Sequence, residues 1–326
     1  MSERGLSEFE VIRRFFTHRA ASAVLGVGDD GAVVRASAGT ELVITADMLV
    51  EGRHFMQNAD ARFLGHKSLA VNLSDMAAMG AAPRWATLAL ALPRVDARWL
   101  RAFAGGFMAL ARRHGVDLIG GDTTRGPLTI CVQIMGEVPR GRALRRDGAR
   151  AGDDVWLSGT VGDAALALAL NRGRMKLPLR ERARLEQRLH APTPRVALGM
   201  ALRGIARSAI DVSDGLAADL GHICECSGVN AEIEWERVPI ARAARALRDQ
   251  RLVQETALGG GDDYELCFTA PKARRAQVER AGRAAKVHLT RIGRITASAR
   301  RKSTVTILDA HGGPLTVRRR GYDHFT

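Results

Sequence analysis

The sequence predicts a two-domain protein of the α/β or α+β class, and three observations support this prediction. The chain has 326 residues, which exceeds the usual size of one domain. Hydrophobic residues make up 46% and charged residues 26%, a globular balance with enough apolar material for two cores. Segments with strand and helix patterns alternate loosely in both halves, without an internal repeat.

The first half is expected to form one domain, residues 1–139. Its predicted helices are Phe9–His18, Ala61–Met79 and Asp96–His114, and its predicted strands are Glu41–Thr45 (continuing into Asp47), Trp85–Leu92, Val116–Ile119 and Leu128–Val138. The second helix is indicated by Leu69, Leu73 and Met76, which recur at helical spacing. Gly115 is a typical residue for ending the third helix. The segment 120–124 (GGDTT) is expected as a loop between two strands.

A connection rich in Gly, Arg and Pro, 139–152, marks the expected boundary, and residues 150–326 are expected to form the second domain. The predicted helices of this half are Asp163–Asn171, Leu179–Leu189, one from Pro192 through Arg203, and one whose buried face carries Leu216, Leu220 and Ile223. The predicted strands are Asp154–Ser158, Ala209–Val212, Tyr264–Phe268, Val305–Leu308 and Leu315–Arg318.

The formal charge of +14 raises the question of nucleic-acid binding. Only five of the 49 basic residues are lysine, and the arginines are spread along the chain. Aromatic residues make up 5%, too few for a surface that stacks on bases. We therefore expect no nucleic-acid partner, although a basic nucleic-acid-binding protein stays the alternative from a different functional class.

The N-terminal segment MSERGLSEFEVIRR is polar, and no apolar run reaches the ~18 residues that a membrane span needs. These features predict a cytoplasmic protein without a membrane partner.

Acidic residues recur beside glycine or at strand ends, in spite of the basic overall charge. They are Asp29 and Asp30 in GVGDDG, Asp47 in ITADML, Asp75 in NLSDMAAMG, Asp122 in IGGDTT, Asp211 and Asp214 in IDVSDG, and Asp262 and Asp263 in GGGDDYE. Each one alone is ordinary turn or cap chemistry, because Asp side chains bond to nearby backbone groups.

Taken together, these carboxylates indicate binding of Mg²⁺ and a nucleotide. Paired aspartates repel each other, and a divalent cation relieves that repulsion. Mg²⁺ takes oxygen ligands, keeps waters and binds few carboxylates plus substrate phosphates. Glycine allows the backbone to approach a phosphate closely.

The sequence argues against two common nucleotide-binding motifs. The chain has no G-x-x-x-x-G-K-[ST] segment, so an ordinary P-loop is absent. GVGDDG has the G-x-G-x-x-G spacing of dinucleotide-binding proteins, but no clear strand precedes it, and two aspartates stand where a pyrophosphate would approach.

The motifs GVGDDGAV, ITADMLVEGRHF, KSLAVNLSDMAAMGA, LIGGDTTRGPL, SAIDVSDGL, GGDDYELCF and the terminal GYDHF resemble, in order and spacing, those of the thiamine-monophosphate kinases. The segment NLSDMAAMGA resembles the wider superfamily of aminoimidazole ribonucleotide synthetase. The resemblance implies a two-domain PurM-like fold, with an N-terminal dimerising ATP and metal domain and a C-terminal α/β sandwich domain that closes the site. It also implies a homodimer that uses ATP and several Mg²⁺ ions to phosphorylate thiamine phosphate to thiamine diphosphate.

The resemblance further implies roles for individual residues. Metal ligands would be Asp30, Thr45, Ala46 (through its carbonyl), Asp47, Asp75, Asp122, Asp211 and Asp214. ATP would contact Gly121, Asp122, Arg146 and Ser213, and thiamine phosphate would contact His54, Asp262 and Tyr322. No nucleophile or general base is implied, because the acceptor is an ionised phosphate, with a second pKa near ~6.

Three positions depart from the family pattern. Ala46 replaces a hydroxyl residue, Asp262 a longer glutamate, and Tyr322 a larger tryptophan. The nearest enzyme alternative is another ATP-using member of the superfamily. Selenophosphate synthetase is disfavoured, because it has a reactive cysteine or selenocysteine in its N-terminal segment, whereas the first cysteine here is Cys131. The hydrogenase-maturation ATPase is disfavoured, because it ends in a cysteine tail, whereas this sequence ends GYDHFT.

Overall fold

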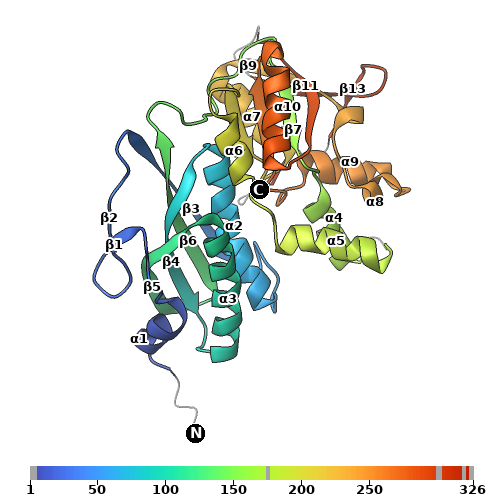
Figure 1. Cartoon of the computed structure of the whole chain (residues 1–326). Coiled ribbons are helices and arrows are strands. Elements are labelled where there is room, and N and C mark those ends of the chain that lie inside the picture. Colours follow the sequence, from blue (N-terminus) through green and yellow to red (C-terminus); the bar gives the residue numbers. More distant parts are fainter. Residues whose placement is uncertain (1–5, 174–176, 299–302, 318–320, 323–326) are drawn as a thin grey trace. The chain divides into compact units, whose positions relative to one another are not determined.

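The computed structural model describes residues 6–173, 177–298, 303–317 and 321–322 (Figure 1). The chain divides into two compact units, Met1–Met76 with Ala81–Gly141, and Ala77–Gly80 with Arg142–Thr326. Each unit is built around a sheet of its own. Within the described ranges, no helix is both long enough and apolar enough to cross a membrane.

The first unit combines a four-stranded sheet with two long helices. Its elements are α1 (Glu8–Val11), the π-helical turn η1 (Ile12–Phe16), β1 (Ala23–Leu25), β2 (Val33–Val34), β3 (Thr40–Val50), α2 (Ala61–Ala78), β4 (Ala82–Leu92), α3 (Ala97–His114), β5 (Asp117–Arg125) and β6 (Thr129–Pro139). The sheet order is β3-β6-β4-β5, in which only β4 and β5 run parallel. Strands β1 and β2 pair separately.

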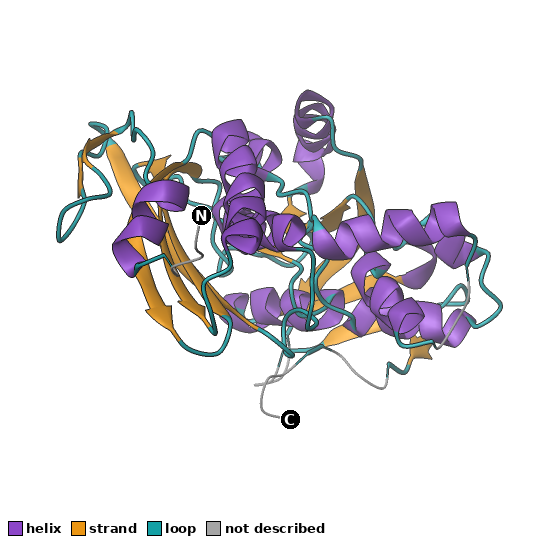
Figure 2. Cartoon of the chain, turned by 90° about the horizontal axis from the view of Figure 1, so that it is seen from below, coloured by secondary structure: helices purple, strands orange, loops and turns teal. Residues whose placement is uncertain are grey.

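One face of this sheet is covered, and Figure 2 shows the long helices of the unit lying along one side of its strands. Helices α2 and α3 approach each other closely at two glycines. A Cβ atom on Gly65 would lie 2.0 Å from the carbonyl oxygen of Phe103, and one on Gly106 would lie 1.9 Å from that of Arg62. No side chain fits at either position, so the two glycines permit the close helix packing.

The other face of the sheet carries exposed apolar side chains. Along β3, Leu42, Ile44 and Met48 are 45%, 56% and 55% exposed, whereas Val43 and Leu49 are buried. Alternate residues of a strand point to opposite faces. Strand β3 therefore carries apolar side chains on both faces of the sheet.

The second unit contains a seven-stranded sheet, ordered β13-β12-β9-β11-β7-β10-β8. Its elements are β7 (Asp154–Ser158), α4 (Asp163–Asn171), α5 (Leu179–His190), α6 (Val196–Leu202), β8 (Ser208–Asp211), α7 (Leu216–Ser227), β9 (Val229–Glu234), η2 (Trp235–Arg237), α8 (Arg242–Arg245), α9 (Gln250–Gly259), β10 (Leu266–Ala270), η3 (Lys272–Arg274), α10 (Arg275–Ala285), β11 (Leu289–Ala297), β12 (Val305–Leu308) and β13 (Pro314–Leu315). Strand β12 is parallel to β9, and the other pairs are antiparallel.

Both faces of this sheet are covered along β7, β10 and the edge strand β8, because these three strands are buried along their whole lengths. Val155 and Leu157 belong to the core that includes α7 and α9. On the opposite face, the rings of Trp156 and Phe268 stack with centroids 6.4 Å apart. Helices α6 and α10 lie on that side (Figure 1).

The predicted α/β or α+β class is confirmed, as are the two long helices of the first unit. Asp96 caps α3 by accepting hydrogen bonds from the backbone of Arg98 and Trp99, and Gly115 ends the helix in the left-handed region. Two expectations need correction, and several elements were not predicted. The segment 120–124 continues β5 and is not a loop. A short strand, β1, does precede GVGDDG. Strands β9 and β11 and helices α8 to α10 were not predicted.

Candidate functional site

In the first unit, the structure brings together four polar residues of β3 and α2. Thr45 and Asp47 alternate with the exposed residues of β3 and so face the helices. The hydroxyl of Thr45 donates a hydrogen bond to Oδ2 of Asp75 on α2. One turn earlier on α2, Oδ1 of Asn72 accepts a hydrogen bond from the backbone N–H of Asp47 at 3.2 Å. Asn72 was not predicted as a site residue.

The two carboxylates of this cluster repel each other. Burial, followed by the nearby charge of Asp75, raises the pKa of Asp47 to about 7. Among the described residues, no group of three or more His, Cys, Asp or Glu side chains could hold a metal ion. A pair of carboxylates with a hydroxyl nevertheless fits Mg²⁺, which binds few protein oxygens and fills its shell with water and phosphate. The fit rests on this donor set and the mutual repulsion of the pair.

Asp122 lies in the same sheet but on its other face. It stands opposite Ala89 of β4, in the row of residues that includes the exposed Met48. Its neighbour Gly121 has φ +145°, and a Cβ there would lie 1.9 Å from the carbonyl oxygen of Leu88. The geometry therefore explains Gly121 by close strand approach, and within one chain it does not bring Asp122 to Asp47.

The acidic turn between β1 and β2 is exposed. Oδ1 of Asp29 accepts a hydrogen bond from the backbone N–H of Asp30 at 2.9 Å, so Asp29 holds the turn. Gly28 has φ +125°, a conformation that favours glycine. Asp30 is exposed on the surface of this turn.

Two further predicted residues of the first unit lie at or near β3. Ala46 points to the open face of the sheet and is exposed. His54 follows β3 in a turn, where its Nδ1 accepts a hydrogen bond from the backbone N–H of Val50 at 3.0 Å. This bond fixes the orientation of the imidazole ring and assigns the proton of the neutral form to Nε2.

In the second unit, the predicted residues gather around the loop between β8 and α7. Asp211 ends β8 and is buried. Ser213 and Asp214 follow it and are half-buried. The backbone carbonyl of Ser213 accepts a hydrogen bond from the N–H of Asp262 at 2.8 Å, and that of Asp214 accepts one from Tyr322 at 2.9 Å. Three segments that are distant in sequence therefore meet here.

A residue that sequence reasoning missed holds this loop in place. Asp219 lies in the first turn of α7, and its Oδ2 accepts hydrogen bonds from the backbone N–H groups of Ser213, Asp214 and Gly215, each at 3.1 Å. Burial and the charge of Asp214 raise the pKa of Asp219 to about 7. An internal carboxylate thus occupies the donors at this helix N-terminus, which an anionic ligand could otherwise use. An acidic residue in a first helical turn was the available signal.

Arg146 lies at a bend in the segment beside the edge strand β8. The preceding residue, Arg145, accepts a hydrogen bond from the backbone of Ala209 in β8 at 3.0 Å. The carbonyl of Arg146 accepts one from the hydroxyl of Ser227 at 2.8 Å. Its side chain is exposed, so the guanidinium is accessible to a ligand.

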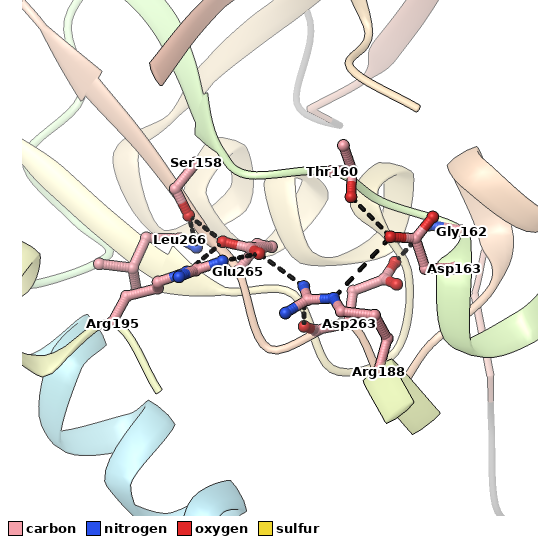
Figure 3. A network of polar contacts seen from close by, with 9 residues as sticks. All are labelled: Ser158, Thr160, Gly162, Asp163, Arg188, Arg195, Asp263, Glu265 and Leu266. Carbon is pink, nitrogen blue, oxygen red and sulfur yellow. Dashed lines mark hydrogen bonds and ion pairs between the residues drawn. The ribbon is translucent and has the colours of Figure 1, made fainter. Parts of the chain in front are cut away.

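Behind the loop 260–265 lies a buried ionic network, shown in Figure 3. The side chain of Glu265 is fully buried and is clamped by two arginines. Nε of Arg195 donates to Oε2 of Glu265 at 2.6 Å, and Arg188 donates to Oε1 at 2.5 Å. The hydroxyl of Ser158 also donates to Glu265. Such charge-assisted bonds are stronger than neutral ones.

Two more acids belong to the same network (Figure 3). Oδ2 of Asp263 accepts a hydrogen bond from the backbone N–H of Gly162 at 2.7 Å, whereas its Oδ1 is buried and has no hydrogen-bond partner in the described part of the chain. Burial raises the pKa of Asp263 well above its usual range. Oδ2 of Asp163 accepts a hydrogen bond from Thr160 at 2.6 Å, and burial raises its pKa too. The network fixes the loop that carries Asp262.

The terminal GYDHF motif is only partly described. Gly321 and Tyr322 lie against the loop at Asp214, and Tyr322 is 38% exposed. The remaining residues of the motif, 323–325, lie outside the described residues, as does Arg318 of the strand predicted at 315–318.

Comparison with protein families matches the chain in two parts. Residues 28–138 match the AIR synthase related protein, N-terminal domain, and residues 150–306 match the AIR synthase related protein, C-terminal domain. Thiamine-monophosphate kinase of Salmonella typhimurium is 44% identical over 322 residues, covering 98% of each chain. The enzyme of Bacillus subtilis is 32% identical and covers 98% of this chain and all of its own.

Comparison with solved structures finds the same family. Thiamine-monophosphate kinase from Stenotrophomonas maltophilia has a TM-score of 0.83 and 48% identity, covering 90% of this chain and 94% of its own. A structure described as AaThiL complexed with AMPPCP and TMP has a TM-score of 0.77 and 32% identity, covering 92% of both chains. The hydrogenase maturation protein HypE in complex with ATP shares the fold, with a TM-score of 0.74 at 21% identity, covering 95% of this chain and 92% of its own. The predicted PurM-like two-domain fold is thereby confirmed.

Proposed function

The chain belongs to the thiamine-monophosphate kinase family, and we propose that it transfers the γ-phosphoryl group of ATP to thiamine phosphate, giving thiamine diphosphate and ADP. The observation that carries this proposal is the match over 98% of both chains to a named kinase of that activity. The related complex with AMPPCP and TMP supports ATP as the co-substrate. The reaction joins two anionic phosphates and therefore needs a cation to neutralise their charge. The carboxylate pair on β3 and α2 fits a magnesium ion and so supports such a reaction.

We further propose that magnesium binds in the first unit through Thr45, Asp47 and Asp75. The wider ligand set inferred from the family adds the carbonyl of Ala46 and the carboxylates of Asp30, Asp122, Asp211 and Asp214. Bound magnesium would neutralise the phosphate charges and so lower the repulsion between donor and acceptor. We propose two domains, residues 1–139 as the metal and ATP domain and residues 150–326 as the second domain, and both contribute binding residues.

The protein's own residues bind and orient the reactants. The acceptor oxygen belongs to a phosphate with a pKa near ~6, so it is ionised at neutral pH and needs no general base. We assign ATP contacts to Gly121, Asp122, Arg146 and Ser213, and acceptor contacts to His54, Asp262 and Tyr322. A carboxylate and an aromatic ring suit the cationic organic part of thiamine phosphate, and the guanidinium of Arg146 suits a phosphate. Because the reaction consumes ATP, we place the protein in the cytoplasm.

The proposal predicts a clear choice of acceptor. Release of ADP from ATP and Mg²⁺ should be fast with thiamine phosphate and at background with thiamine or an aminoimidazole ribonucleotide precursor. A preference for the aminoimidazole compound would instead favour the other enzymes of the superfamily. Salt-dependent binding of DNA without turnover of ATP would favour the nucleic-acid alternative.

We also propose that the open face of the first sheet pairs with a second copy of the chain. Three large apolar residues of β3, namely Leu42, Ile44 and Met48, are about half exposed on this face. Contiguous apolar surface of this kind is typical of protein interfaces. Asp122 lies on the same face. Its carboxylate would then lie at the dimer interface, which is consistent with its place on the opposite face of the sheet from Asp47.

The double change Ile44→Lys and Met48→Lys should weaken the dimer on the order of a hundredfold or more, because charged side chains would lose solvent at the interface. Size-exclusion chromatography with light scattering measures the mass. Leu179→Lys is the matched control, since this apolar residue is 85% exposed but lies on α5. A dimer in all three proteins would contradict this assignment of the interface.

A further inference from the structure

The segment between α9 and β10 has an unusual backbone. Asp262 has φ +70° and Tyr264 has φ +53°, both in the left-handed region that favours glycine. Tyrosine is rarely found there, because its Cβ crowds the backbone. Strained residues of this kind persist only where the surrounding structure holds them, and they gather at functional sites.

The surrounding contacts that hold this segment come from two sides. On one side, the backbone N–H groups of Asp262 and Tyr264 donate to the carbonyls of Ser213 and Val212, each at 2.8 Å. On the other side, the intervening Asp263 points into the buried network of Figure 3. The backbone of the segment is thereby held on both sides.

The result is a direct contact between the two side chains. The phenol of Tyr264 donates a hydrogen bond to Oδ1 of Asp262 at 2.8 Å. Tyr264 as a whole is 8% exposed and so is almost entirely buried, whereas Asp262 is half-buried. A donor on a side chain that is held in place by burial restricts the rotamer of the carboxylate that it contacts.

We propose that Tyr264 is a positioning residue, which fixes the carboxylate of Asp262 toward the cationic heteroaromatic part of the acceptor. This inference rests on the proposed function. A carboxylate attracts an organic cation and repels a phosphate, so Asp262 suits the thiamine end of the substrate and not its phosphate end. The shortness of Asp262, compared with a glutamate, makes its orientation more important, because it has fewer rotatable bonds with which to find the ligand.

The test is a double-mutant cycle with Tyr264→Phe, Asp262→Asn and the double variant, assayed by steady-state kinetics. Loss of one hydrogen bond to a charged group should raise KM for thiamine phosphate about tenfold in Tyr264→Phe. We expect kcat and KM for ATP to change less than about twofold. In the Asp262→Asn background, Tyr264→Phe should raise KM for thiamine phosphate by less than about a further twofold, because the partner of the hydroxyl is already altered.

Thr269→Val is the matched control, since it removes a buried hydroxyl from β10 that hydrogen-bonds to Ser208 at 2.7 Å, whereas Asp262 lies in the segment before this strand. It should leave both KM values unchanged.

An unmodified protein that is inactive on thiamine phosphate would overturn the proposed function and this inference with it. An active protein in which Tyr264→Phe leaves KM unchanged, or in which the two changes multiply fully, would overturn the inference alone. The inference would also be overturned if Tyr264→Phe lowered kcat about tenfold and lowered Tm without changing KM, because that result indicates a merely structural role.

Discussion

The substitution Asp75→Asn is expected to lower kcat by at least about a hundredfold while leaving the fold intact. The carboxylate of Asp75 is half of the pair that we assign to magnesium, and an amide is a far weaker ligand for that ion. The fold should survive because Asn still offers an oxygen to the hydroxyl of Thr45. Burial is the larger cause of the raised pKa of Asp47, and removing the charge of Asp75 relieves the repulsion that adds to it. Thermal unfolding should therefore show an unchanged or slightly raised Tm.

Asp60→Asn is the control for this change, because it makes the same substitution at the start of the same helix. Oδ1 of Asp60 accepts hydrogen bonds from the backbone of Arg62 and Phe63, and asparagine caps helices equally well. Turnover of this variant should match that of the unmodified protein. Near-normal turnover of Asp75→Asn at saturating Mg²⁺ would refute the metal assignment.

The second large effect concerns stability and is expected for Glu265→Ala. The fully buried carboxylate lies between Arg188 and Arg195, so its removal leaves two partly buried cations without their shared partner. Breaking a buried ion pair in this way costs about 3–5 kcal/mol of unfolding free energy. For a unit of this size that corresponds to a fall in Tm of roughly 10 °C.

Glu232→Ala is the comparison for this stability effect. Glu232 pairs with Arg294 at the surface, where the side chain of Arg294 is 64% exposed. Exposed pairs of this kind contribute at most about 1 kcal/mol. Differential scanning calorimetry of the two variants measures the difference. A loss of 1 kcal/mol or less in Glu265→Ala would show that the network of Figure 3 is not essential to the stability of the second unit.

The parts of the fold that could be predicted are those with strong local signals. Helix α3 has an Asp96 cap, an apolar face and a Gly115 stop, and each of these acts within a few residues of the chain. Strand β5 was predicted too short because Gly120 and Gly121 resemble a turn in sequence. Only the close approach of Leu88 in the neighbouring strand shows why glycine is needed within a strand there.

The candidate site was predictable as a set of acidic residues but not as a geometry. The motif with Asp75 pointed to the pair with Asp47, yet the contact depends on α2 crossing the covered face of β3. Nothing in the local sequence shows that Asp122 points to the opposite face, because this depends on strand register. Asp219 was missed for a similar reason, since its function is to accept three backbone bonds from a loop that folds back onto it.

The central claim is direct phosphoryl transfer from ATP to thiamine phosphate. The most direct measurement follows the label of γ-³²P ATP in a reaction with the protein, Mg²⁺ and thiamine phosphate. We expect the label in thiamine diphosphate, in equal amount to the ADP formed, and none on acid-precipitated protein. Label that reaches only inorganic phosphate, or that stays bound to the protein in stoichiometric amount, would contradict this account.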